Sequence, residues 1–442
     1  MKRIKNLMSL LLSCLLAPLA VLAQVTPDST AGRLTLEQCV AFALENQAQV
    51  QLAQLDEEIG ERQIRAQLSG WLPQVSANYA LTHNLKLQQS VFGDQVVTIG
   101  QKYTSSINFQ ANQTLYSNDL LLASRAARFT RTALDLNTKA TKINTVVEVS
   151  KAFYNILLSQ EQLRILDENI SRQQKQYQDA RAQYEQGLVD KTDYQRATIT
   201  LNSIRADRKR TMEAIKAQTA YLQELMGLPV NTTLSLAYDY EQMQQDIFVD
   251  TTQSATYANR VEFQQLQTQR QVQDLNTRYY RWGFLPTASA FINYNPTYFS
   301  NSFSDVYRQS YPTSAAGLQV GIPIFQGGRR LQNVRISLLQ EQSLNLELEN
   351  LQRSINTEYQ SALADYKSDY NDWLTLQTNV QLAQDVYDVI KLQYDEGIKA
   401  YLDLIVAETD LRTAQLNYYN ALYDVLSSKL DVQRALGTIA VN

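Results

Sequence analysis

Few residues of this chain could carry out catalysis, since it holds one histidine and two cysteines among its 442 residues. His83 lies in an alternating apolar pattern and is expected to be an interfacial polar residue, not a metal ligand. The sequence contains no glycine-rich phosphate loop, no His-Glu-x-x-His and no Gly-x-Ser-x-Gly. We therefore expect no enzymatic activity, no cofactor, and no catalytic, cofactor-binding or metal site.

Two short stretches, 210 residues apart, repeat one pattern of polar residues. They read YEQGLVDKTDY at 184–194 and YDEGIKAYLDL at 394–404. Each has a tyrosine, a glycine three residues on, and an aspartate six residues after that. Gly187 and Gly397 are expected to end helices in the left-handed conformation, which glycine adopts without steric cost. Each stretch therefore predicts a turn between two helices.

The polar residues of these turns could serve only to begin the returning helices. Thr192 and Gln195 have the spacing of a capping box. Asp193 and Asp403 would lie in first helical turns, where the helix dipole favours a carboxylate. This structural interpretation explains much of the pattern without any further function.

The N-terminus predicts export. Residues 1–23 have a basic start, an apolar stretch and a small final residue, which are typical of a secretory signal peptide. The apolar run before Cys14 is short and fits a lipoprotein cleavage site poorly, so we do not expect lipidation there. After cleavage Cys39 is the only cysteine, so no intrachain disulfide can form and stability must come from packing.

Charge and hydropathy argue against two further classes of protein: nucleic-acid-binding proteins and proteins with a membrane-spanning helix. The formal net charge is −4, and loss of the three basic residues of the signal peptide makes it more negative, which argues against a nucleic-acid partner. No later apolar run reaches 18 residues, so no helix is expected to span a bilayer alone.

Proline and glycine positions predict long helices. No proline occurs between Pro73 and Pro229 or after Pro323, and interior prolines would break helices. The longest segments have about 68 residues, which corresponds to roughly 100 Å at 1.5 Å per residue. Each is followed by a turn and a returning helix. The predicted helices are 118–186, 191–226, 329–396 and 400–436.

Other segments alternate between apolar and polar residues, as strands with two different faces do. A membrane barrel and a soluble sheet with one solvated face both give this pattern. The loops between paired strands, near 85–102 and 296–313, are rich in polar residues and tyrosine and are expected to be exposed to solvent. The predicted strands are about 74–85, 103–116, 287–295 and 314–325.

The whole chain reads as a duplication, with a first repeat at 24–231 and a second at 232–442. Each repeat has the order helix, strand, loop, strand, very long helix, turn, returning helix. Four strands cannot close a membrane barrel, and open edges in lipid would leave backbone groups unsatisfied. If the strands span a membrane, several chains must share one barrel.

At this point the sequence resembles the TolC-type outer-membrane efflux protein family over essentially the whole mature chain. The resemblance implies a mainly α fold with a membrane β-barrel. Three chains would form a homotrimer in which twelve strands close the barrel and long antiparallel coiled-coil helices form a periplasmic α-barrel. The marks that carry it are Leu72-Pro73, Leu285-Pro286, the stretch PIFQGGR at 323–329, Leu436-Gly437 and the two turns.

The resemblance also gives the two turns a role, because in this family they close the periplasmic entrance. It implies that Tyr394 and Lys399 of the second turn bond to Thr192 and Asp193 of a first-type turn. Three copies of Asp403 would form an anionic ring. Lysine would hold this contact less strongly than arginine, because its ammonium group cannot make the two parallel hydrogen bonds that a guanidinium makes to a carboxylate. A second acidic ring is not expected, since that position holds a valine.

The implied function is a passive duct in the outer membrane of a Gram-negative bacterium, extending into the periplasm. The implied partners are outer-membrane lipid, a periplasmic adaptor (membrane fusion protein) and an inner-membrane transporter of the RND or ABC type. Two alternatives remain open: a periplasmic coiled-coil scaffold and a surface-binding protein without channel activity. Extraction only by detergent would favour the duct, whereas release in salt washes would favour the scaffold.

Overall fold

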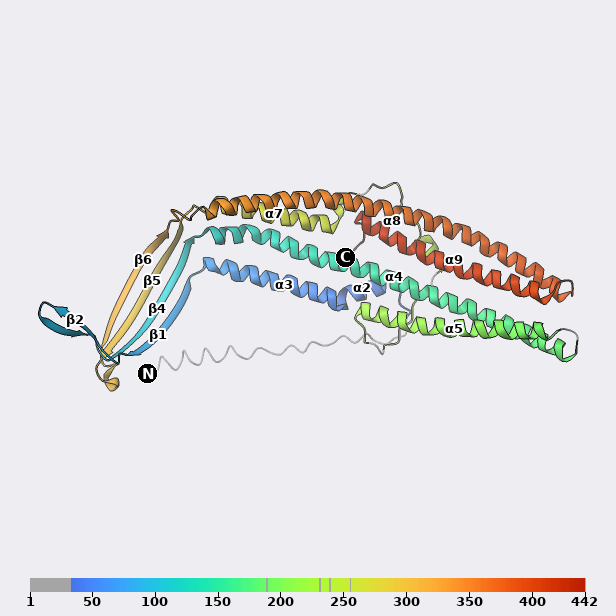
Figure 1. Cartoon of the computed structure of the whole chain (residues 1–442), viewed down its shortest axis with the longest axis horizontal. Coiled ribbons are helices and arrows are strands. Elements are labelled where there is room, and N and C mark those ends of the chain that lie inside the picture. The colour runs from blue at the N-terminus through green and yellow to red at the C-terminus, as the bar shows by residue number, and fades with distance from the viewer. Residues whose placement is uncertain (1–32, 188–189, 230–231, 238–239, 255, 442) are drawn as a thin grey trace.

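A computed structural model describes residues 33–187, 190–229, 232–237, 240–254 and 256–441. The predicted signal peptide, 1–23, and Cys14 lie outside these residues. The helices run side by side as one elongated bundle, and four long strands leave the bundle together at one end (Figure 1). The helical turns lie at the opposite end.

Two very long helices dominate the bundle. Helix α4 spans Asn118–Glu185, with 68 residues, and α8 spans Arg329–Asp395, with 67. Neither contains a proline, so the backbone hydrogen bonds continue without a kink over roughly 100 Å. After each comes a returning helix of 36 residues, α5 (Lys191–Met226) and α9 (Tyr401–Leu436).

Shorter helices pack against the long ones. They are α2 (Leu36–Asn46), α3 (Ala48–Leu68), α6 (Tyr240–Gln245) and α7 (Val261–Arg281), with 3₁₀ segments at Ser69–Trp71 and Tyr257–Asn259. Thr35 caps α2 in a complete capping box with Gln38. Glu61 of α3 accepts hydrogen bonds from Arg131 of α4 at 2.7 Å and Arg65 at 2.8 Å, and these lower its pKa to about 2.

The same contact occurs in both repeats, between the end of the returning helix and an early helical segment of that repeat. Gly227 ends α5 and Gly437 ends α9, both with positive φ. A side chain on Gly227 would lie 2.4 Å from the carbonyl oxygen of Asn46, and one on Gly437 would lie 2.9 Å from that of Asn259. Each returning helix therefore ends against the start of its own repeat, where only glycine fits.

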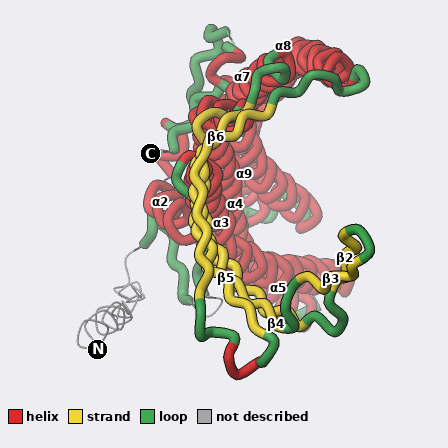
Figure 2. Tube along the Cα trace, turned by 90° about the vertical axis from the view of Figure 1, so that its left-hand side faces the viewer, coloured by secondary structure: helices red, strands yellow, loops and turns green. Residues whose placement is uncertain are grey.

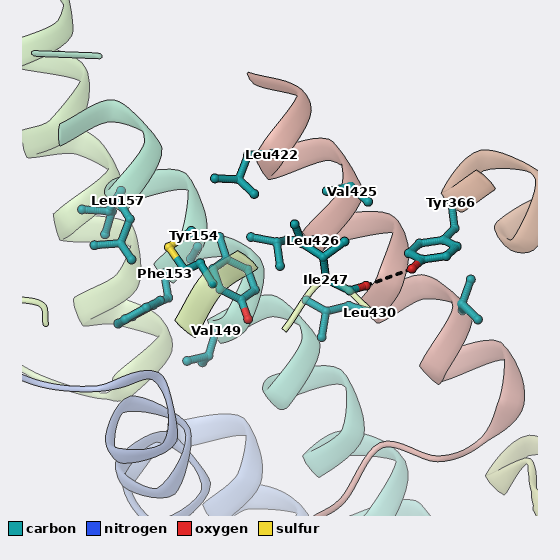
Figure 3. Close-up of a cluster of buried hydrophobic side chains, with 14 of the residues drawn as sticks. Val149, Phe153, Tyr154, Leu157, Ile247, Tyr366, Leu422, Val425, Leu426 and Leu430 are labelled. Atoms are coloured by element: carbon teal, nitrogen blue, oxygen red, sulfur yellow. Dashed lines mark hydrogen bonds between the residues drawn. The ribbon is translucent and has the colours of Figure 1, made fainter. Parts of the chain in front are cut away.

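The main hydrophobic core lies where α4, α8 and α9 meet the segment after α6 (Figure 3). Ile247 of that segment is buried, and its carbonyl oxygen accepts a hydrogen bond of 2.9 Å from the Tyr366 hydroxyl. Burial raises the pKa of Tyr366, so the phenol stays protonated and keeps donating. The core also contains Val149, Phe153, Tyr154, Leu157, Leu422, Val425, Leu426 and Leu430.

The long strands form one antiparallel sheet in the order β1-β4-β5-β6. They are β1 (Gln74–His83), β4 (Tyr103–Tyr116), β5 (Thr287–Ser300) and β6 (Ser310–Gly321). The β4–β5 pairing joins the first repeat to the second. Strands β1 and β6 are the edges of the sheet.

The strand registers gather most of the apolar residues of the four strands on one side. Tyr79 lies opposite Ile107, Phe109 opposite Tyr294, and Ala290 opposite Leu318, as alternation predicts. We call this side the apolar face. It contains Val75, Ala77, Tyr79, Leu81, Ile107, Phe109, Ala111, Ala290, Ile292, Tyr294, Ala316, Leu318 and Val320. The other side, the polar face, contains Ser76, Asn78, Thr82, Asn108, Gln110, Asn112, Ser289, Asn293, Asn295, Thr313 and Gln319.

The second strand pair departs from the expected bounds. Strand β5 continues to Ser300 instead of ending near residue 295, and β6 covers 310–321 instead of 314–325. Pro296 and Pro312 lie opposite each other inside the pair. Proline lacks an N–H and therefore suggests the end of a strand, which is why the sequence predicts a loop in both segments. In the structure Pro296 has no partner in β4, and the pairing of β4 with β5 resumes beyond it.

The first outer loop, near 85–102, is exposed as expected and contains a hairpin. Strands β2 (Gln88–Phe92) and β3 (Gln95–Ile99) pair with each other alone. Gly93 and Asp94 form the two-residue turn, a sequence signal for a hairpin that the prediction missed. In Figure 2 the hairpin lies on the side toward which the arc of helices opens.

Among the described residues, no helix is long and apolar enough to cross a membrane.

The two sheet faces predict opposite effects of a charge. Arginine at Ile107, in the middle of β4 on the apolar face, should destabilise the membrane-inserted channel by about 2–4 kcal/mol. Arginine at the adjacent Asn108, on the polar face, should be tolerated. The measurement is the urea midpoint of the channel folded into lipid vesicles. Equal midpoints for both variants would contradict lipid contact at the apolar face.

Candidate functional site

The two turns at the far end of the bundle have the geometry that their glycines require. Gly187 has φ +73° and Gly397 has φ +74°. Their amides donate to the carbonyl oxygens of Tyr184 at 3.0 Å and Tyr394 at 2.9 Å. Because a Cβ would be strained at these φ values, the glycines fix where both long helices end.

The returning helices are capped differently from the prediction. Thr192 and Gln195 do not form the capping box, because Asp190 is the N-cap of α5. The Asp190 carboxylate accepts a hydrogen bond of 3.1 Å from the Thr192 amide. In the second turn Asp403 accepts a hydrogen bond of 3.3 Å from the Ala400 amide. Both carboxylates thus satisfy amides that a helix N-terminus leaves free.

The four helices meet near the turns in a small aromatic group, which we call the tip cluster. It brings together both hairpins, α4–α5 and α8–α9. The rings of Tyr394 and Tyr401 are 5.9 Å apart, and those of Tyr177 and Tyr194 are 5.6 Å apart. Its buried members are Ala180, Ala197 and Tyr401, and Tyr177, Tyr394 and Ile405 pack against them.

The structure brings some of the predicted site residues together and leaves others apart. Burial, followed by the carboxylates of Asp179 and Asp193, raises the pKa of Tyr394, so its phenol remains a hydrogen-bond donor. Asp193 is half-buried near this cluster, whereas Thr192 and Lys399 are exposed. Among the described residues of this single chain, the Lys399 side chain makes no ion pair.

A buried polar group behind the turns escaped the sequence analysis. Glu408 of α9 is 3% exposed and accepts hydrogen bonds from Arg172 at 3.3 Å, Gln176 at 2.9 Å and Gln173, all on α4. We call these four residues the polar clasp. The Arg172 guanidinium also lies 5.8 Å from the ring of Tyr387 on α8.

The clasp connects the α8–α9 hairpin to the α4–α5 hairpin at a fixed distance from the turns. Glu408 follows Tyr401 by seven residues, so it lies roughly 10 Å along α9 from the tip cluster. A buried carboxylate without partners would cost several kcal/mol, which makes the pairing of α9 with α4 specific. A sequence signal existed, because Glu408 falls within the apolar stripe of Leu404, Ala407 and Leu411.

The described residues contain no group of three or more His, Cys, Asp or Glu side chains that could hold a metal ion. Asp190 and Asp403 at the tip cap helix ends, and the residues of the clasp hydrogen-bond to each other. Among these described residues, no nucleophile lies next to a general base.

Residues 40–228 and 253–438 match the family described as outer membrane efflux protein. The chain belongs to this family. The two matched segments fall one in each repeat. The outer membrane protein TolC of Vibrio cholerae is 22% identical over 437 residues, covering 96% of each chain. The alkaline protease secretion protein AprF of Pseudomonas aeruginosa is 24% identical, covering 88% of this chain and 81% of the relative.

Solved structures show the same fold. CusC, described in terms of transmembrane channel formation, has a TM-score of 0.74 at 19% identity and covers 91% of both chains. The open state of the Neisseria gonorrhoeae MtrE outer membrane channel has a TM-score of 0.72 at 18% identity, covering 91% of this chain and 88% of that one.

These findings confirm the resemblance seen in the sequence. The protein is an outer-membrane channel for efflux or secretion, and its family consists of channel proteins. Its four strands are one third of a twelve-stranded trimeric barrel, and its long helices extend into the periplasm. The apolar face is then the side that meets lipid, because a barrel of this kind has a polar interior.

The clasp predicts a large effect of one buried residue. Glu408→Ala leaves Arg172 and two glutamine amides without their acceptor, which should destabilise the helical bundle by about 3 kcal/mol or more. The measurement is thermal loss of helical circular dichroism in detergent. Asp410→Ala, an exposed carboxylate on the same helix, is the matched control and should change the midpoint little. Similar midpoints for both variants would show that the clasp does not hold α9 to α4.

Proposed function

We propose that the two turns of three chains form the closed periplasmic end of this channel, and that the channel is a passive duct that opens when the turns separate. The observation that carries the proposal is the tip cluster, in which all four helices of one chain converge beside the turns. Within it, Tyr394 of the second hairpin faces Ala180 and Ala197 of the first. A hairpin that moved outward would have to break this contact.

The proposed lock consists of Tyr394 and Lys399, which bond to Thr192 and Asp193. Tyr394 is placed for this role because its phenol is protonated and near the Asp193 carboxylate. Lys399 is exposed and forms no ion pair with the described residues of its own chain, so it is available to a first-type turn of a neighbouring chain. Gly187 and Gly397 hold the two turns in the shape that presents these side chains.

Asp403 has a second proposed role. It is half-buried in the first turn of α9, beside the second glycine turn. Three copies around a threefold axis would form an anionic ring at the narrow end of the duct. One of its carboxylate oxygens caps α9, and the other lone pairs remain available to a passing cation.

The proposed partners are a periplasmic adaptor and an inner-membrane transporter of the RND or ABC type, which would supply both the cargo and the energy. Two relatives support this proposal: one is named a probable efflux pump outer membrane protein, and the other an alkaline protease secretion protein. The long helices, with their turns at the end away from the strands, would bring the entrance to such partners.

The lock predicts a conductance change in planar bilayers. The double variant Tyr394→Phe with Lys399→Ala removes one hydroxyl and one charge at the tip. Each exposed contact contributes only about 0–1 kcal/mol, but a trimer loses three of each. The single-channel conductance should therefore rise several-fold above that of the parent channel.

The matched control is made in the other turn. Tyr184→Phe with Lys191→Ala removes the same groups from the first turn, where Tyr184 is the repeat equivalent of Tyr394. Its conductance should stay at the parent level. A double variant at 394 and 399 that conducts like the parent would leave helix capping as the full account of the turns.

The ring predicts a change of selectivity. Asp403→Asn should reduce the preference for cations and weaken block by multivalent cations, because three negative charges leave the narrowest part of the duct. The measurement is the reversal potential in a salt gradient. Asp250→Asn removes the same charge far from the turns and should leave the reversal potential unchanged. An unchanged potential in Asp403→Asn would rule out the ring.

A further inference from the structure

The second outer loop is anchored to the sheet by side-chain contacts. Residues 301–309 connect β5 to β6 and include a 3₁₀ turn at Phe303–Asp305. Tyr307 forms a 2.8 Å hydrogen bond with the hydroxyl of Tyr79 and accepts one of 3.3 Å from Ser105. The neighbouring Val306 is fully buried. Most of the loop is exposed, as expected, but these contacts fix its position against the sheet.

The loop covers the apolar face and not the polar one. Tyr79 and Ser105 both belong to the apolar side of the register. Phe303 of the loop also packs edge-on against Tyr103 of the same side, with ring centres 5.6 Å apart. Tyr79 lies four residues inside the last pair of β1, and the two tyrosine side chains meet at their hydroxyl groups.

The part of the apolar face next to the loop mixes aromatic residues with serines. Moving outward from Tyr79, the next row across the sheet contains Leu81, Ser105, Tyr298 and Ser310, and the last row contains His83, Tyr103 and Ser300. The rings of Phe303 and Tyr307 add to the aromatic residues that the strands already place there.

The rings and charges of the loop have the arrangement of a membrane interface. Phe303 is 61% exposed and Tyr307 is 55% exposed, both on the outer surface of the loop. Tyr298 and Tyr307 are in contact edge to face at 5.3 Å, and His83 stacks on Tyr103 at 4.4 Å. Aromatic rings with polar tips gather where a barrel leaves the hydrocarbon region.

Polar groups complete the outer rim of the loop. Asp305 and Arg308 form an exposed ion pair at 3.5 Å, and Ser302 and Ser304 share a hydrogen bond of 2.9 Å. The Asn301 side chain accepts a 3.2 Å hydrogen bond from the Lys102 amide, which ties the loop to the start of β4. Such groups suit the hydrated headgroup layer and not the hydrocarbon.

We propose that residues 301–309 form an aromatic collar that contacts the lipid headgroups of the outer leaflet, with one collar from each chain around the trimeric barrel. The partner is the membrane lipid itself. The collar sets how deeply the barrel sits, because the apolar band lies directly beneath it. This inference does not depend on how the periplasmic end closes.

The test compares spin labels at two phenylalanines on opposite faces, in vesicles of phosphatidylcholine. Phe303→Cys places the label on the collar. Phe299→Cys is the matched control on the polar face, where Phe299 packs against Tyr311 with ring centres 5.7 Å apart. Native Cys39 is fully buried, and burial raises its pKa to about 12, so the parent protein should take up no label.

The expected result is a several-fold higher ratio of oxygen to nickel-chelate accessibility at 303 than at 299, because oxygen concentrates in lipid and the chelate stays in water. Adding Tyr307→Phe should free the loop, giving a more mobile spectrum and a lower ratio at 303. Tyr311→Phe should leave the 303 spectrum unchanged. Each sample is used only if it migrates as an intact trimer before heating.

Two results would overturn the proposal. Equal accessibility ratios at 303 and 299 would place the loop in water, either outside the membrane or inside the barrel. A spectrum at 303 that Tyr307→Phe leaves unchanged would show that the contact with Tyr79 does not hold the loop on the apolar face.

Discussion

The hydrogen bonds that one chain cannot make for itself govern this structure. Strands β1 and β6 each present a row of free N–H and C=O groups at the edge of the sheet. In a bilayer every such group costs several kcal/mol, and no water is present to satisfy it. The only remedy is pairing β6 of one chain with β1 of the next until the barrel closes. The trimer is thus a condition of membrane insertion, and everything beyond the sheet must fit a threefold arrangement.

The helices pack through apolar residues together with polar ones. Their seams include tyrosines and buried polar groups, and the polar clasp ties α9 to α4 where a purely apolar seam could slide by a turn. Ion pairs across the bundle, such as Lys151 with Asp431 at 2.7 Å, add further fixed points between the same two helices. Buried polar pairing of this kind contributes more to a unique register than to net stability. A duct wall that must stay aligned over roughly 100 Å benefits from that specificity.

The parts of the fold that follow from local backbone chemistry were predictable from the sequence. Missing prolines and well-placed glycines give the helix ends to within one residue, as at Glu185 and Asp395. Strand ends were harder to predict, because Pro296 reads as a break although the β4–β5 pairing only omits two residue pairs there and then continues. The cap at Asp190 was missed because a nearby threonine had the more familiar spacing. Glu408 and the collar depend on contacts between distant segments, and a single sequence does not show which segments meet.

The pairing of β4 with β5 has a consequence for how many equivalent positions the assembly has. Within a chain, the last strand of one repeat lies beside the first strand of the next, and between chains β6 and β1 must repeat this relation. Six similar half-chains therefore follow one another around the duct, and chain boundaries alternate with repeat boundaries. Only residues that differ between the repeats, such as Lys399, reduce this near-sixfold order to threefold. A protein that recognises helix packing alone would find six equivalent grooves, whereas one that recognises the turn side chains would find three.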